Sequence, residues 1–198
     1  MIMGGDLEGT ARWFHEETGI DSPVDAFDVA DALDLRIEHI HGTGGRWEPG
    51  RVVLGRSTPA RKTHSVLVHE CAHELLHRVR TVNDERSARY LAAAILVPRR
   101  ALDRQLRAGW DLHRLMAFHT NASAELLARR ITDVRSAHLA VYDHGRLRYR
   151  VGPAKPLATE LALVAQALST SAPVRVDDCS GAWPVFDGQW RRVLVLAS

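Results

Sequence analysis

Two histidines and a glutamate at fixed spacing are the residues of this sequence that most clearly point to metal chemistry. His69-Glu70-Cys71-Ala72-His73 has the form H-E-x-x-H. On a helix, successive residues turn by about 100°, so His69 and His73 leave the same face one turn apart and can share one ion. Glu70 is offset from both histidines and can flank the ion as a general base without binding it. The pattern therefore predicts a zinc site that activates water.

A third protein ligand must come from another element, because a catalytic zinc takes three protein ligands and keeps one position open. We expect Glu85 to be this ligand, since the spacing of Ala88 and Ala92 places it on the apolar face of a following helix. Asp84 is the rival ligand. It points away from that face and is better suited to favour the helix dipole from the first turn.

A second copy of the motif overlaps the first, as His73-Glu74-Leu75-Leu76-His77. It offers His77 as a ligand and Glu74 as a base. We favour the first copy, because Leu75 and Leu76 are typical of core packing. His77 is then expected to be buried or to lie behind the ligands. The alternative for the whole cluster is an amphipathic helix that carries histidines on a polar face.

The elements that must position these residues are two consecutive helices. Thr58-Pro59 predicts a helix start, with the Thr58 hydroxyl as cap, and the helical pattern runs to about Val79. Asn83 or Asp84 can cap a second helix, which Pro98 ends. An apolar stripe on the second helix indicates that the two pack against each other.

The rest of the chain alternates short helical and strand patterns. Further helices are expected at residues 6–17, from Pro23 with Phe27 on the buried face, and at 98–107, 111–119, 123–133 and 156–168. Strands are expected at 35–40 and 51–55, which could pair as a hairpin, and at 138–142, 146–151, 174–176 and 192–196. The expected fold class is α+β, with a mainly helical metal-binding domain at residues 1–134, including a small β-hairpin or sheet, and a small mixed α/β lobe at 135–198.

Composition indicates an ordinary globular protein. The chain has 198 residues and a formal net charge of only +2, which argues against general coating of DNA. Its first ten residues lack the apolar run of a secretory signal, and nowhere do 18 apolar residues follow one another, so no membrane partner is expected. The two cysteines are too few for a disulfide framework. A cytoplasmic location is expected.

The two helices resemble the signature of the ImmA/IrrE family of zinc metallopeptidases. The matching stretches are residues 69–77 and residues 85–98, which end in Leu76-His77 and in Leu96-Val97-Pro98. The resemblance implies zinc as cofactor, His69, His73 and Glu85 as ligands, and Glu70 as catalytic base. Arg89 departs from the pattern, since Asn or Asp is common at that position.

The resemblance also implies a substrate and a regulatory lobe. Members of the family typically cleave or inactivate a helix-turn-helix repressor encoded beside them, which releases genes of mobile elements, stress response or anti-phage defence. Some carry a C-terminal GAF-like lobe that is thought to sense a signal, and residues 135–198 look compatible with one. In the mechanism we expect, a substrate strand pairs with an exposed edge near residues 51–54.

Other features of the sequence offer weaker alternatives. Cys179 lies in an expected loop and is a candidate inhibitory fourth zinc ligand, or else an unligated cysteine. Trp183, Phe186 and Trp190 could stack on a single-stranded nucleic-acid activator, although core packing explains them as well. Residues 111–133 could form a DNA-binding helix-turn-helix. A protein that holds zinc and merely sequesters the repressor is the leading alternative to an enzyme.

Overall fold

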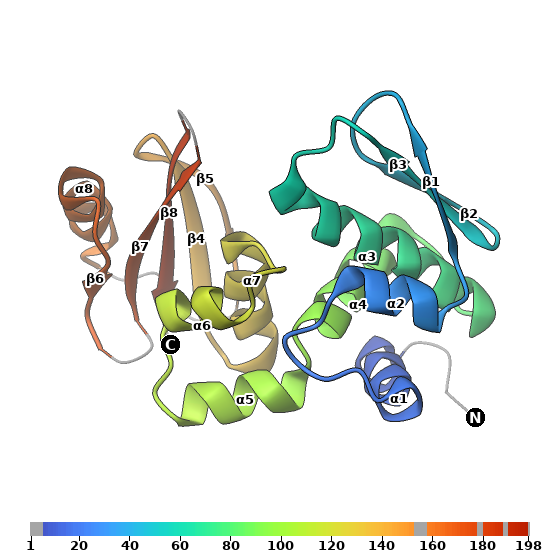
Figure 1. Cartoon of the computed structure of the whole chain (residues 1–198). Coiled ribbons are helices and arrows are strands. Elements are labelled where there is room, and N and C mark those ends of the chain that lie inside the picture. Colours follow the sequence, from blue (N-terminus) through green and yellow to red (C-terminus); the bar gives the residue numbers. More distant parts are fainter. Residues whose placement is uncertain (1–5, 153–157, 178–179, 188–189, 198) are drawn as a thin grey trace. The chain divides into compact units, whose positions relative to one another are not determined.

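The structure is a computed structural model that describes residues 6–152, 158–177, 180–187 and 190–197 (Figure 1). Its helices are α1 (Leu7–Thr18), α2 (Ala26–Ala32), α3 (Ala60–Arg78), α4 (Glu85–Leu96), α5 (Arg99–Arg107), α6 (Leu112–Phe118), α7 (Ala124–Val134) and α8 (Glu160–Thr170). Its strands are β1 (Arg36–Ile40), β2 (Gly45–Glu48), β3 (Arg51–Gly55), β4 (His138–Asp143), β5 (Arg146–Val151), β6 (Val174–Arg175), β7 (Gly181–Asp187) and β8 (Trp190–Ala197). The fold is α+β, as the sequence predicts.

The chain divides into two compact units. The N-terminal unit runs to Ala101 and also contains His119–Ser123, and the C-terminal unit consists of Leu102–Phe118 and the chain from Ala124 onward. The helices α6 and α7 therefore belong to the unit that holds the second sheet. The division lies at other residues than the expected boundary at residue 135, since α7 packs on β4 and β8.

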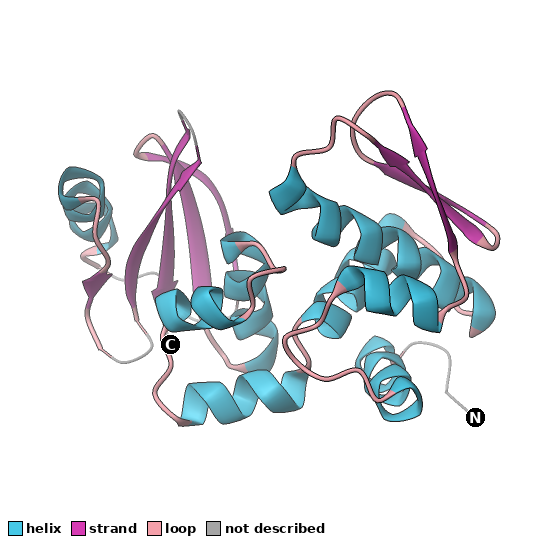
Figure 2. Ribbon diagram, in the orientation of Figure 1, coloured by secondary structure: helices cyan, strands magenta, loops and turns pink. Residues whose placement is uncertain are grey.

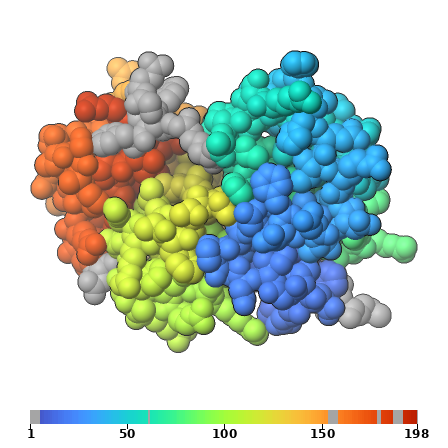
Figure 3. Space-filling view, in the orientation of Figure 1, coloured from blue at the N-terminus to red at the C-terminus, as the bar shows by residue number. Residues whose placement is uncertain are grey.

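The N-terminal unit combines a three-stranded sheet with four helices. Its strand order is β1-β3-β2, in which β1 runs parallel and β2 antiparallel to β3. The helix α3 packs against α2, α4 and β2, while α1 packs on α4. On the face shown in Figure 3, the visible surface of this unit comes mostly from α1, α2 and the strands.

Local capping explains where several of these helices begin. Asp6 accepts a hydrogen bond from the Gly9 amide at 2.8 Å and begins α1, which ends at Gly19 in the left-handed region, with φ at 68°. Asp84 accepts from the Ser87 amide at 2.7 Å and begins α4. Asp25 caps α2 in the same way.

Several sequence predictions for this unit are wrong. The expected hairpin between residues 35–40 and 51–55 does not form, since β1 and β3 are parallel neighbours and the hairpin partner of β3 is β2. Thr58 does not cap α3, because its hydroxyl accepts from the Gly44 amide instead. Phe27 is 39% exposed rather than buried. The strand pairing and the hydrogen bond of Thr58 depend on residues that are distant in sequence. Phe27 lies on the solvent side of the short helix α2.

The C-terminal unit is a five-stranded sheet covered by helices on both faces (Figure 2). The strand order is β5-β4-β8-β7-β6, and each neighbouring pair is antiparallel. The helix α8 packs on β6, β7 and β8, and α7 contacts β4 and β8 on the other face. The core beneath α8 consists of Ala140, Tyr142, Leu163, Val164, Ala167, Ala182, Val193 and Val195. The strand β7 is absent from the sequence prediction.

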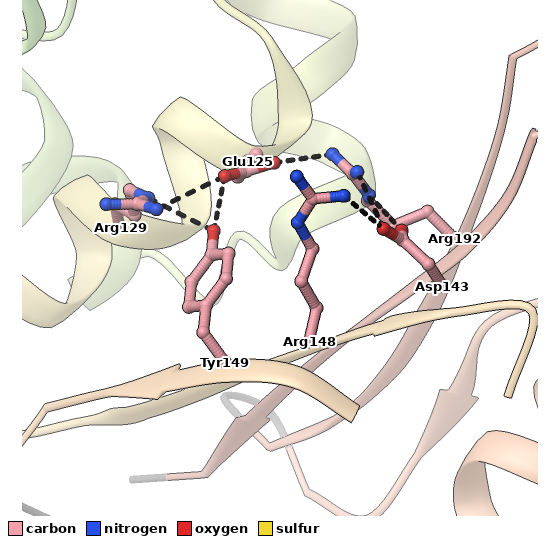
Figure 4. Close-up of polar contacts among 6 residues, drawn as sticks. All are labelled: Glu125, Arg129, Asp143, Arg148, Tyr149 and Arg192. Carbon is pink, nitrogen blue, oxygen red and sulfur yellow. Dashed lines mark hydrogen bonds and ion pairs between the residues drawn. The ribbon is translucent and has the colours of Figure 1, made fainter. Parts of the chain in front are cut away.

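A polar network holds α7 against this sheet. Its members are Glu125, Arg129, Asp143, Arg148, Tyr149 and Arg192 (Figure 4). Glu125 on α7 accepts from Arg192 at 2.6 Å and also from the hydroxyl of Tyr149. Arg192 donates in turn to Asp143 at 2.7 Å. These contacts join α7 to β4, β5 and β8 of the sheet.

The buried His119 makes the stability of the N-terminal unit depend on pH. Burial lowers the pKa of His119 to about 4, below the value of about 6.5 in an unfolded chain. The unfolded state therefore binds more protons between these values, and stability is lost as the pH falls through this range. We expect the free energy of unfolding to fall by roughly 1–2 kcal/mol more between pH 7 and pH 5 in the wild type than in His119→Leu. Urea unfolding at both pH values measures this difference, and equal losses in the two proteins would contradict it.

Within the described residues, no helix is long and apolar enough to cross a membrane.

Candidate metal centre

The helix α3 presents the two histidines of the motif on one face, as its period requires. The rings of His69 and His73 lie 4.9 Å apart, edge to face. Burial lowers the pKa of His69, and the neighbouring His73 acts in the same direction. A neutral imidazole is the form that binds a metal. Both side chains retain some contact with solvent, so an ion and a substrate can reach them.

Glu85 completes the cluster from the first turn of α4. One carboxylate oxygen lies 3.3 Å from Nε2 of His69 and the other lies 3.4 Å from Nε2 of His73. The side chain is exposed, unlike the buried stripe of Ala88 and Ala92 behind it. Arg89, one turn later, also approaches this carboxylate, at 3.4 Å. The structure thus brings together the three residues that the sequence nominates as ligands.

These donors fit a zinc ion in kind and in spacing. Two ligand atoms that are each about 2.0–2.1 Å from a tetrahedral zinc lie about 3.3 Å apart. The separations between the histidine nitrogens and the Glu85 oxygens, 3.3 and 3.4 Å, match this value. One donor atom from each of the three residues lies within 4.8 Å of the others. Two histidines and one glutamate are also the ligand set of a known class of zinc peptidases.

Asn83 fixes the orientation of His73, a role that the sequence did not assign to it. Its side-chain oxygen lies 2.6 Å from Nδ1 of His73, and its side-chain nitrogen donates to the His73 carbonyl at 3.1 Å. Because the amide oxygen only accepts, Nδ1 carries the proton and Nε2 is left free for the metal. The expected alternative, that Asn83 caps α4, does not hold, since Asp84 is the cap.

We expect Asn83→Ala to weaken zinc binding by roughly 10–100-fold, because a ligand loses the partner that fixes its ring. Asn83→Asp keeps the oxygen that accepts from Nδ1 and should lose much less. Competition with a chromophoric chelator measures both affinities. Equal zinc affinities of Asn83→Ala and the wild type would show that this contact does not support the site.

Glu70 follows His69 on α3 but is not part of the cluster of His69, His73 and Glu85. It is 8% exposed and lies under the strand β2, close to Gly45. Burial raises the pKa of Glu70, while His73 and the Trp47 amide oppose the rise. At Gly45 the strand comes so close that an added Cβ would lie 3.0 Å from Cγ of Glu70 and 2.6 Å from Val66. A larger residue at this point would therefore require the Val66 and Glu70 side chains to shift.

The second copy of the motif serves another purpose. Glu74 is buried and accepts hydrogen bonds from Arg78 at 2.7 Å and from the indole of Trp47 at 2.8 Å. His77 is exposed, contrary to the expectation of burial, and its ring lies 5.5 Å from that of Trp47. Neither residue is part of the metal cluster. Cys71 is buried, and burial raises the pKa of its thiol to about 12, as suits an unreactive core residue.

The remaining candidate residues lie in the C-terminal unit. Cys179, the candidate fourth ligand, falls outside the described residues. Trp183 is 2% exposed and belongs to the interior of this unit, so it cannot stack on a nucleic-acid base. The side chains of Phe186 and Trp190 also fall outside the description.

Comparison with known proteins places these observations in a family. The profile described as the IrrE N-terminal-like domain, Peptidase_M78, matches residues 30–132, just over half of the chain. A solved structure named as a Mycobacterium tuberculosis transcriptional regulator is similar in fold, with a TM-score of 0.68 and 13% sequence identity over 98% of this chain and 76% of that chain. No curated protein matches the sequence. The match includes both metal-binding helices, and the chain belongs to the family of IrrE N-terminal-like domains.

Proposed function

We propose that the protein is a zinc-dependent endopeptidase whose metal is held by His69, His73 and Glu85. The observation that carries the proposal is the convergence of His69, His73 and Glu85, whose donor atoms lie within 4.8 Å of one another, beside the buried carboxylate of Glu70, which is outside this cluster. A purely structural zinc site would have four protein ligands and no need of a base. Membership of a family named for peptidases supports the same assignment.

In this mechanism Glu70 moves protons. Zinc at such a site supplies Lewis-acid polarisation of the scissile carbonyl and makes water a better nucleophile near neutral pH. Glu70 takes a proton from the attacking water and later gives it to the leaving amine. His73, oriented by Asn83, keeps its Nε2 directed to the metal.

The strand that would receive the substrate is β2, not the expected edge at residues 51–54. Those residues form β3, which is the central strand of the sheet and has both edges paired. β2 is an outer strand and packs on α3. The Gly55 amide bonds to the Gly44 carbonyl, so the alternation of an antiparallel ladder directs the backbone groups of Gly45 and Trp47 away from β3. An extended peptide could pair with this edge beside Glu70.

The substrate we propose is a helix-turn-helix repressor encoded beside this protein, whose cleavage would release stress, mobile-element or anti-phage defence genes in the cytoplasm. The family membership supports this choice, and the structural neighbour is itself named a transcriptional regulator. The C-terminal unit, which we propose as a GAF-like sensor, would receive the activating signal, a nucleic acid or a small molecule.

The test is incubation of the zinc-loaded protein with the purified neighbouring repressor, followed by intact mass spectrometry. A discrete cut that disappears with a chelator and returns with zinc is the expected result. A stable complex without cleavage, under conditions where zinc is bound, would favour sequestration of the repressor over proteolysis.

A further inference from the structure

We propose that Trp47 is a positioning residue of the metal centre, which holds the ligand His73 in place from the strand β2. The inference rests on the proposed function, because only that function makes the metal centre catalytic. The effect of Trp47 on metal binding can be measured without a substrate.

Trp47 contacts α3 at His73, Glu74 and His77. Its indole ring stacks on the ring of His73, with centroids 6.1 Å apart and planes at 21°. The ring also leans on His77, at 5.5 Å and 51°. One residue thus touches a proposed ligand and the next histidine along α3.

The indole is itself held in place through Glu74. Its Nε1–H donates to Oε2 of Glu74 at 2.8 Å, and Arg78 donates to the other oxygen at 2.7 Å. Glu74 is 5% exposed, and a buried carboxylate of this kind is costly unless its oxygens are hydrogen-bonded. Arg78 also bonds to the Leu33 carbonyl, just after α2. The ring of Trp47 is therefore anchored at its polar end while its face rests on His73.

These contacts restrict His73 from two sides. Asn83 fixes one edge of the imidazole by a hydrogen bond at Nδ1, and Trp47 covers the ring face. A ligand ring held in this way loses little freedom when the metal binds, which raises affinity.

The experiment compares Trp47→Ala and Trp47→Phe with the wild type in the full-length protein. Zinc affinity is measured by competition with a chelator, and ligand geometry by the visible spectrum of the cobalt-substituted protein. We expect Trp47→Ala to weaken zinc binding by roughly 10–100-fold, with a changed cobalt spectrum. Trp47→Phe keeps a ring over His73 but loses the bond to Glu74, so its affinity should lie between the other two.

Trp110→Ala is the matched control. Trp110 is half-buried and packs on an aromatic neighbour, Phe118, at 5.6 Å, but it lies in the C-terminal unit. The Trp110→Ala substitution should leave zinc affinity and the cobalt spectrum unchanged. If Trp47→Ala folds and binds zinc as tightly as the wild type, with only a lower melting temperature of the apo protein, Trp47 is structural and the inference fails.

The positioning role of Trp47 and the proposed peptidase function can be tested separately. If the wild type binds zinc but cuts no repressor, while Trp47→Ala binds zinc more weakly, then the positioning role stands and the proposed peptidase function fails.

Discussion

Glu70→Gln is expected to abolish cleavage while zinc stays bound. The amide has nearly the shape of the carboxylate and fits the same buried position, so the ligands on the same helix should not move. It cannot take up a proton, and loss of a positioned general base costs about 10²–10⁴-fold in rate. The rate of repressor cleavage, together with the zinc content of the same preparation, measures the effect.

Glu70→Asp tests whether a carboxylate at this position is enough for cleavage. The carboxylate of Asp lies one methylene further from the attacking water, so we expect a cleavage rate between those of the wild type and Glu70→Gln. A zinc-loaded Glu70→Gln protein that cuts at the normal rate would remove Glu70 from the mechanism. Loss of zinc in Glu70→Gln would instead indicate that the residue supports the metal site directly.

Glu85→Ala is expected to lose zinc, whereas Asp84→Ala should keep it. The two carboxylates are adjacent, but only Glu85 approaches the histidine nitrogens, at 3.3 and 3.4 Å. Loss of a ligand should weaken zinc binding by more than the roughly 10–100-fold typical of a lost hydrogen-bond partner. Asp84 caps α4 through the Ser87 amide, so its removal should cost about 1 kcal/mol of stability instead.

Metal analysis after dialysis and thermal unfolding of the apo proteins distinguish these two effects. Apo Glu85→Ala should unfold near the wild-type temperature, because the Glu85 side chain is exposed. Apart from the histidines, its ion-pair partner is Arg89, which is exposed as well. If Asp84→Ala loses zinc while Glu85→Ala retains it, the assignment of the third ligand is reversed.

The sequence alone gave a good account of the elements and of the metal-binding residues. Nearly every helix was expected within a few residues of its observed bounds, because capping residues and apolar periods are local signals. Several strands were also expected, but β2 and β7 were not. β2 lies in a Gly-rich stretch that was read as a turn, and β7 contains Pro184 and follows residues read as a loop.

What the sequence determined by itself was the geometry within one helix. The spacing of His69 and His73 fixes both rings on one face of α3, whatever the rest of the chain does. The nomination of Glu85 needed one further step, namely that α4 packs on α3. The sequence supported that step through the small residues Ala88 and Ala92.

Only the tertiary structure decided what surrounds these residues. Asn83 contacts His73, which is 10 positions away across a loop. Trp47 on a strand contacts Glu74 on a helix, 27 positions away. No period or local propensity encodes such contacts, because they depend on how separate elements pack. The same is true of β2 as the free edge, since strand order follows from pairing between segments and not from the pattern within any one of them.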